Sequence, residues 1–248
     1  MDKSIYVAMT GAKQALRAQA VNSHNLANVS TTGFRADKIA FQDAPVNGAG
    51  FDSRANTVAT SQGWNDNGGA IIATGRELDV AINGDGFIAV QAPDGGEAYT
   101  RAGDFRLSVT GQLTTGAGHA VLGEGGPIAI PPNIKLTIGG DGTISIIPLG
   151  QGPETQAAVN RIKLVNPPPE LLQKGGDGLL RTTDGSLPPP DAAVSLLSGS
   201  LETSNVNATE ALVNMIELAR QYEMQVKIIH ETDENATRAA QLLRLNSS

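Results

Sequence analysis

The residue types that most often carry enzyme chemistry are sparse in this chain and are scattered along it. The chain has no cysteine, which excludes disulfides, thiol nucleophiles and thiolate metal sites. Its three histidines, His24, His119 and His230, show no metal-ligand spacing to one another or to a carboxylate motif. We therefore interpret each histidine as a surface or helix-contact residue rather than a ligand.

The glycine-rich segment AINGDGFIAV, residues 81–90, resembles a phosphate-binding loop only superficially. It lacks the GK[ST] ending, and it leads into another strand pattern rather than a helix N-terminus, so no helix dipole points at an anion. The turn aspartates Asp85, Asp94 and Asp141 show no EF-hand spacing, and no serine lies in a G-x-S-x-G motif. From these patterns we predict that the protein is not an enzyme and that it binds no cofactor, metal or small-molecule substrate. An enzyme with an unrecognised site is the alternative.

The strongest pattern in the chain is a seam of small and apolar residues near its C-terminus. The seam residues are Ala208, Leu212, Met215, Ala219, Tyr222, Val226, Ile229, Ala236, Ala240 and Leu243, with the polar Asp233 among them. Their alternating four-three spacing is typical of a coiled coil. It predicts a helix over residues 208–245, about 57 Å long, capped by Asn207. A seam this narrow requires a partner, either from this chain or from another.

A second amphipathic helix is predicted at the N-terminus, over residues 4–28. Its seam residues are Ile5, Met9, Ala12, Leu16, Ala20 and Ala27. The helix ends in NLANVSTTGFR, where Gly33 favours a turn. The two terminal helices are therefore expected to pack together, with Asp233 as a candidate for setting the register of the contact.

Between the helices the pattern changes twice. Residues 42–69 are polar and glycine-rich, which predicts an extended loop, with Trp64 packed on the adjacent domain. From residue 70, apolar residues alternate with polar ones and turn sequences separate them, as in half-buried antiparallel strands. The fold class is therefore α+β: terminal helices forming a coiled-coil layer, and an inserted antiparallel β-rich domain, sandwich or barrel-like, that ends before the proline runs at 167–169 and 188–190. The expected domains are residues 1–41, 42–69, 70–198 and 199–248.

Charge and hydropathy exclude two classes of partner. The net charge of −7, without a cluster of Lys and Arg, argues against nucleic-acid binding. No apolar run approaches membrane-spanning length, so no direct membrane insertion is expected. The N-terminal sequence MDKSIYVAMTGAKQAL lacks the continuous apolar core of a cleaved signal peptide. The chain is expected to be cytosolic, or to leave the cell by a route that reads no such signal.

Four stretches together resemble the bacterial flagellar rod and hook proteins. They are NLANVSTTGFR, TGRELDVAINGDGFIAVQ, EAYTRAGDFRLSVTGQLTT and GSLETSNVNATEALVNMIELARQYEMQVKIIHETDEN. The ending, ELARQYEMQVK followed by ENATRAAQLL, most resembles the proximal-rod members of the flagellar basal-body rod protein family, with the distal-rod members or another axial flagellar protein as the alternative. The chain departs from the common family pattern at His24, where an asparagine is usual, and at Ile88, where a phenylalanine is usual.

The resemblance implies a structural subunit of the proximal rod, the drive shaft that transmits torque across the periplasm. It implies export without a cleaved signal, through the flagellar type III apparatus, and partners that are copies of this chain and other rod proteins. The implied assembly contacts of the N-terminal segment are Ile5, Met9, Ala12, Leu16, Ala20, Asn25, Leu26, Asn28, Gly33 and Phe34. Those of the C-terminal helix are Leu212, Met215, Ala219, Tyr222, Val226, Ile229, Asp233, Ala236, Ala240 and Leu243. A self-contained secreted β-rich binding module is the alternative from a different class.

Overall fold

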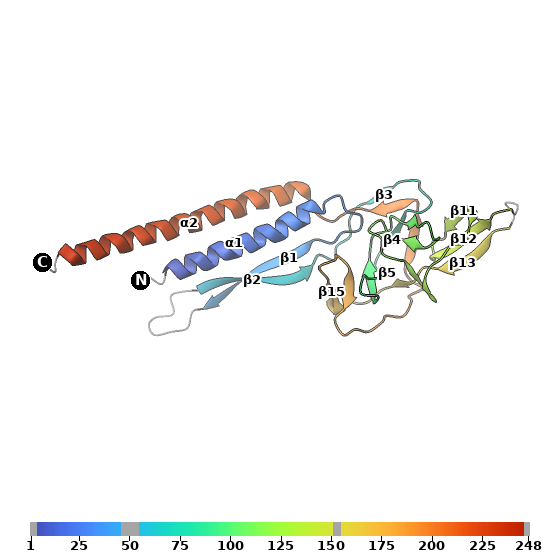
Figure 1. Cartoon of the computed structure of the whole chain (residues 1–248), viewed down its shortest axis with the longest axis horizontal. Coiled ribbons are helices and arrows are strands. Elements are labelled where there is room, and N and C mark those ends of the chain that lie inside the picture. Colours follow the sequence, from blue (N-terminus) through green and yellow to red (C-terminus); the bar gives the residue numbers. More distant parts are fainter. Residues whose placement is uncertain (1–3, 46–54, 151–154, 246–248) are drawn as a thin grey trace. The chain divides into compact units, whose positions relative to one another are not determined.

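The computed structural model describes residues 4–45, 55–150 and 155–245, and Figure 1 shows its elements. The chain divides into two compact units. The first unit comprises Met1–Ala27, Asp37–Gly63 and Asn207–Ser248, and the second comprises Asn28–Ala36 and Trp64–Val206. The fold class is α+β, as predicted, with a β-rich region between two terminal helices.

The first unit is built from the two predicted helices and a pair of strands. Helix α1 (Ser4–Ala27) and helix α2 (Ala208–Leu245) have nearly the predicted bounds. They run antiparallel and side by side, with the two-stranded sheet of β1 (Asp37–Pro45) and β2 (Ala55–Trp64) beside them (Figure 1). The N-terminus of α2 forms at the predicted cap, because Asn207 Oδ1 accepts hydrogen bonds from the amides of Thr209 (3.0 Å) and Glu210 (3.3 Å).

Strands β1 and β2 correct the prediction of an extended loop over residues 42–69. Most of that range that the structure describes is strand, and residues 46–54 lie outside the described part. Part of the contact between these strands and α1 is polar. Gln14 of α1, which is buried, accepts a hydrogen bond from the amide of Ala59 in β2 at 3.2 Å.

The second unit is a set of short antiparallel sheets. The largest has the strand order β14-β5-β6-β16-β15, and a three-stranded sheet has the order β11-β12-β13. Two-stranded pairs are β17-β4, β18-β3, β9-β10 and β7-β8. The strand bounds are β3 (Ile71–Ala73), β4 (Val80–Asn83), β5 (Phe87–Gln91), β6 (Glu97–Thr100), β7 (Arg106–Leu107), β8 (Leu113–Thr114), β9 (Leu122–Gly123), β10 (Gly126–Pro127), β11 (Asn133–Ile138), β12 (Thr143–Pro148), β13 (Ala157–Arg161), β14 (Leu164–Val165), β15 (Leu172–Lys174), β16 (Leu180–Thr182), β17 (Ser195–Ser198) and β18 (Ser200–Glu202). One 3₁₀ helix, η1 (Pro169–Leu171), lies within the first proline run and its continuation.

The β-rich region continues past both proline runs, which corrects its predicted end. Strands β15 and β16 follow the first run and join the five-stranded sheet, and β17 and β18 follow the second. These strands have three or four residues each, which is too short for a period of two to be recognised in the sequence.

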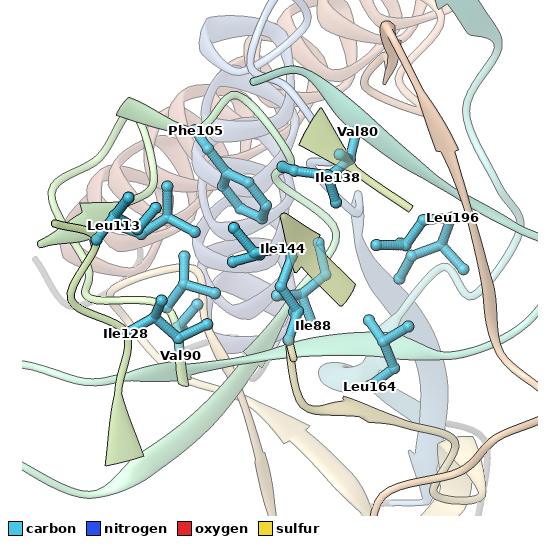
Figure 2. Packing of buried hydrophobic residues seen from close by; sticks show 14 of the residues in the cluster. Val80, Ile88, Val90, Phe105, Leu113, Ile128, Ile138, Ile144, Leu164 and Leu196 are labelled. Carbon is cyan, nitrogen blue, oxygen red and sulfur yellow. The ribbon is translucent and has the colours of Figure 1, made fainter. Parts of the chain in front are cut away.

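Strand β5 explains why the core of this unit has two parts. Phe87 and Ala89 point to one face of the five-stranded sheet, and Ile88 and Val90 point to the other. Figure 2 shows the larger cluster, in which Ile88 and Val90 meet side chains of the other sheets, such as Ile144 of β12. Both faces of β5 are therefore buried.

Phe87 and Ala89 belong to a second, smaller cluster of buried side chains, which also contains Trp64. Trp64 therefore packs on the β-rich domain, as predicted. It is 8% exposed, and its ring meets that of Phe87 edge to face, with 6.0 Å between the ring centroids. Because it is the only tryptophan of the chain, its fluorescence reports on this core.

Candidate assembly site

The face of α1 that packs against α2 is lined by alanines. Ala8, Ala12, Ala15 and Ala18 are each 7% exposed or less. A side chain added at Gly11 would meet the carboxamide of Gln225 at 3.0 to 3.2 Å. Small residues on α1 therefore let the two helix backbones approach closely.

The predicted seam of α1 lies beside this face rather than on it. Of the predicted residues, Ala12 is buried and Ile5 is half-buried, but Met9 (53%) and Leu16 (48%) are among the exposed apolar side chains, and Ala20 is also exposed. Ala8 and Ala15, which directly precede the predicted Met9 and Leu16, are buried in their place. A small side chain allows the helices to approach more closely.

On α2, too, the buried face is displaced from the predicted seam. The residues that α2 buries or half-buries also follow a four-three spacing: Ala211, Met215, Leu218, Tyr222, Gln225, Ile229 and Thr232. Met215, Tyr222 and Ile229 belong to both sets, and the predicted Ala219 and Val226 are half-buried at the edge. Leu212 is 50% exposed, and Asp233 and Ala236 are exposed, while the side chains of Ala240 and Leu243 lie outside the described residues.

Both helices consequently carry apolar side chains that the chain itself leaves in solvent. On α1 these are Tyr6, Met9 and Leu16, and on α2 they are Leu212, Val213, Ile216, Met224 and Ile228, each between 45% and 64% exposed. Exposed patches of large apolar side chains are typical of protein–protein contact sites.

The first asparagine of the NLAN segment, Asn25, connects α1 to β1. Asn25 of α1 donates through Nδ2 to the carbonyl oxygen of Asp37 and accepts at Oδ1 from the amide of the same residue, both at 2.9 Å. The side chain thus pairs with the first residue of β1 as a neighbouring strand would. His24 Nδ1 lies 2.9 Å from the Asp37 carboxylate. Together these contacts fix β1 against the last turns of α1.

A groove of about 390 Å³ lies among α1, β1 and α2 in the first unit. Val21, Ile39, Phe41 and Leu218 give it an apolar lining, and the carboxylates of Asp37 and Glu217 give it negative charge. Phe41 is 47% exposed, so the groove presents apolar surface to solvent.

Gly33 and Phe34 are both buried in the second unit. Gly33 has a φ of +64°, and a Cβ there would overlap the carbonyl carbon of Arg101. Its amide donates to the carbonyl oxygen of Glu202 at 2.8 Å. The Phe34 ring lies under the ammonium of Lys174, 4.0 Å from the ring centroid. Asn28, also in this unit, accepts hydrogen bonds from Thr31 in the turn that precedes Gly33.

Two buried arginines of the second unit share one buried glutamate. Glu202 is 2% exposed, and its two carboxylate oxygens accept from Arg35 Nη1 at 2.6 Å and from Arg101 Nη1 at 3.1 Å. The amide of Gly69 donates to the same carboxylate at 2.9 Å. Burial lowers the pKa of Arg101, against the opposing effect of Glu202. We call Arg35, Arg101 and Glu202 the charge triad.

Each member of the charge triad comes from a different part of the sequence. Arg35 ends TTGFR, Arg101 lies in EAYTRAGDF, and Glu202 lies in GSLETSN. The sequence analysis quoted these motifs but did not select the three residues.

Within the described residues, no group of three or more His, Asp or Glu side chains could hold a metal ion. Of the helices that the structure describes, neither has the length and apolar character needed to cross a membrane. The features that remain are a helix pair with exposed apolar residues, a groove, and a buried charge triad that joins remote segments.

Comparison with known proteins places these features in one family. Three family models match: the flagella basal body rod protein over residues 5–35, the flagellar hook protein FlgE/F/G D1 domain over 81–146, and the flagellar basal body rod FlgEFG protein C-terminal over 197–242. The flagellar basal-body rod proteins FlgF of Salmonella typhimurium and of Escherichia coli are each 45% identical over 252 residues, which is 99% of this chain and 100% of theirs. The flagellar basal-body rod protein FlgG of Buchnera aphidicola subsp. Schizaphis graminum is 38% identical over 271 residues, 98% of this chain and 100% of its own.

The chain therefore belongs to the flagellar basal-body rod protein family, and it is a structural protein of the flagellum. Within the family it is more similar to these two FlgF proteins than to the FlgG protein, as its last forty residues predicted.

Proposed function

We propose that this chain is a subunit of the proximal rod and that it polymerises through α1 and α2 into the drive shaft that carries motor torque. The observation that carries the proposal is the set of large apolar side chains that both helices leave exposed. Burying one such side chain against a neighbouring subunit contributes about 1.5–3 kcal/mol. Several per subunit, repeated along a polymer, stabilise an assembly that a single chain does not need.

The proposal includes partners and location. The subunit contacts copies of itself and other rod proteins, it reaches the periplasm through the flagellar type III export apparatus, and it has no catalytic role. Head-to-tail contacts that do not close into a ring build an open helical structure, which suits a shaft.

Substitutions on the exposed side of α2 test the assembly role. Ile216→Asp and Met224→Asp change side chains that are 56% and 59% exposed, so each chain is expected to fold normally while losing assembly. Each variant replaces the native copy in the flagellated bacterium, and swimming in soft agar and the rod content of purified basal bodies are measured. Val109→Asp is the matched control, since Val109 is fully exposed in the second unit and its substitution is expected to leave both unchanged.

Normal motility and normal rod content in both α2 variants would contradict the proposal. Circular dichroism and tryptophan fluorescence of each purified variant establish that it has folded, so that a loss of assembly is not mistaken for a loss of structure.

A further inference from the structure

The two proline runs of the chain, residues 167–169 and 188–190, line a single pocket in the second unit. Its volume is about 370 Å³, and Leu171, which is 45% exposed, contributes to the same lining. Several of the prolines are themselves exposed, and Leu187, which precedes the second run, is 66% exposed. Apolar surface therefore extends from the pocket to the surface around it. We call this site the proline pocket.

Backbone hydrogen bonds hold the two proline runs in place. The amide of Asp191, directly after the second run, donates to the carbonyl oxygen of Leu164 at 2.8 Å, a few residues before the first run. The carbonyl oxygen of Leu171 accepts from the amide and from the hydroxyl of Thr183, both at 2.8 Å. Because proline also fixes its own φ, the walls of the pocket are rigid. A preformed pocket binds a partner without an added cost of ordering its own chain.

The segments that form the proline pocket are acidic. Residues 164–173 and 182–192 contain no Lys, Arg or His, and their charged residues are Glu170, Asp184 and Asp191. Asp191 belongs to the lining of the pocket. Asp184 accepts a hydrogen bond at 2.7 Å from the hydroxyl of a serine in the same lining. The partner that complements this surface is therefore positively charged.

The basic residues on the other side of Asp191 do not cancel this charge. Arg161 and Lys163 line a smaller cavity of about 110 Å³ together with Asp191 and two further carboxylates, those of Glu124 and Asp141. Lys163 Nζ donates to both carboxylate oxygens of Glu97, at 2.7 and 2.9 Å. The bases of that cavity are thus matched by acids of their own.

We infer that the proline pocket binds a protein segment in which an aromatic side chain is flanked by Lys or Arg. Extended proline segments, such as Pro168 with φ −56° and ψ 135°, offer the surface on which aromatic side chains pack in proline-rich recognition. Aromatic residues and arginine are also the types that protein–protein interfaces favour. The ring enters between the two runs, and the basic groups face Glu170, Asp184 and Asp191. This contact involves the second unit alone, so it does not depend on polymerisation through α1 and α2.

Binding of a synthetic peptide to the full-length chain tests the inference. The probe is the dye-labelled peptide Ser-Arg-Tyr-Arg-Ser, and fluorescence anisotropy measures its affinity. Binding is expected to saturate and to weaken as salt is added. A peptide with alanine in place of tyrosine is expected to bind roughly tenfold more weakly, and one with glutamate in place of arginine is expected not to bind. Amide NMR shifts of the labelled chain should be largest around Leu171, Leu187 and Ala192.

Substitutions in the pocket have matched controls elsewhere in the second unit. Leu171→Ala is expected to weaken binding several-fold, whereas Leu107→Ala, which shortens a leucine that is 41% exposed, leaves it unchanged. Asp191→Asn removes one charge but keeps an oxygen for the hydrogen bond from the Ala193 amide, and it is also expected to weaken binding several-fold. Its control is Glu77→Gln, at an exposed glutamate. Unchanged urea midpoints establish that each variant is folded.

Three results overturn the inference: no binding of the tyrosine peptide at millimolar concentration, equal binding of the alanine peptide, or equal affinities for Leu171→Ala and Leu107→Ala. The second result would mean that charge alone attracts the peptide. None of these results affects the proposed assembly through α1 and α2, which the motility variants test separately.

Discussion

Removal of the glutamate at the centre of the charge triad is expected to destabilise the second unit strongly. Glu202 is 2% exposed and faces two guanidinium groups whose side chains are 3% and 8% exposed. Glu202→Ala leaves both positive charges buried without their counter-ion, which costs about 3–5 kcal/mol. Glu202→Gln keeps the shape and one acceptor oxygen, so its cost is expected to be smaller but still well above that of a surface change.

Urea unfolding followed by fluorescence measures this cost. The only tryptophan, Trp64, is buried against Phe87 in the same unit, so its emission reports on the unfolding of that unit. With a urea dependence of about 2 kcal/mol per M, a loss of 3–5 kcal/mol shifts the midpoint down by roughly 2 M. The matched control is Glu77→Ala, which removes a glutamate 3.7 Å from Lys135 with both side chains more than half exposed. It is expected to change the stability by about 0.5 kcal/mol or less.

Equal midpoints for Glu202→Ala and Glu77→Ala would refute the reasoning. That result would mean that water or a rearranged backbone compensates the two arginines as well as the carboxylate does. A further discriminating variant is the triple change Arg35→Met/Arg101→Met/Glu202→Leu. It is expected to recover part of the loss, because no buried charge is then left unpaired.

Three further perturbations follow from single contacts. Gly33→Ala is expected to lower the urea midpoint of the second unit by more than an ordinary glycine substitution does. The φ of +64° is strained for alanine, and the added Cβ overlaps the Arg101 carbonyl. A midpoint within error of the wild type would contradict this. Burial raises the pKa of Tyr99 above its ordinary value near 10, and the Glu97 carboxylate adds to the shift. As the pH rises, the unfolded chain therefore loses this proton before the folded chain does. The free energy of unfolding consequently falls above about pH 10. Tyr99→Phe is expected to flatten that fall, as urea midpoints measured at pH 9 and 11 would show, and equal slopes for the two proteins would refute the assignment. Ala15→Leu is expected to destabilise the helix pair by about 1–3 kcal/mol, because Ala15 is 1% exposed at the contact and a larger side chain does not fit there. Circular dichroism on heating should show the loss of helix at a lower temperature. Tryptophan emission should stay unchanged at temperatures where the second unit remains folded.

The predicted seam on α2 shows how far periodicity alone could lead. Two sets of residues that share Met215, Tyr222 and Ile229 satisfy the same four-three spacing. One runs through Leu212 and Ala219, and the other runs through Ala211 and Leu218. The period establishes a helix with a contact face but cannot choose between the two sets. The packing against α1 makes that choice, since Ala211 is 5% exposed and Leu212 is 50% exposed.

The sequence by itself determined the two helices, the limits of α2, the strand-rich middle and the family. These depend on local signals: an apolar period, the Asn207 cap, turn residues, and motifs read in order along the chain. Only the tertiary structure decided which residues of α2 meet α1, that β1 and β2 form beside α1, and that Arg35, Arg101 and Glu202 share one buried site. The physical reason is that burial of a polar or charged group depends on partners from remote segments, and no local pattern in the sequence states which segments will meet.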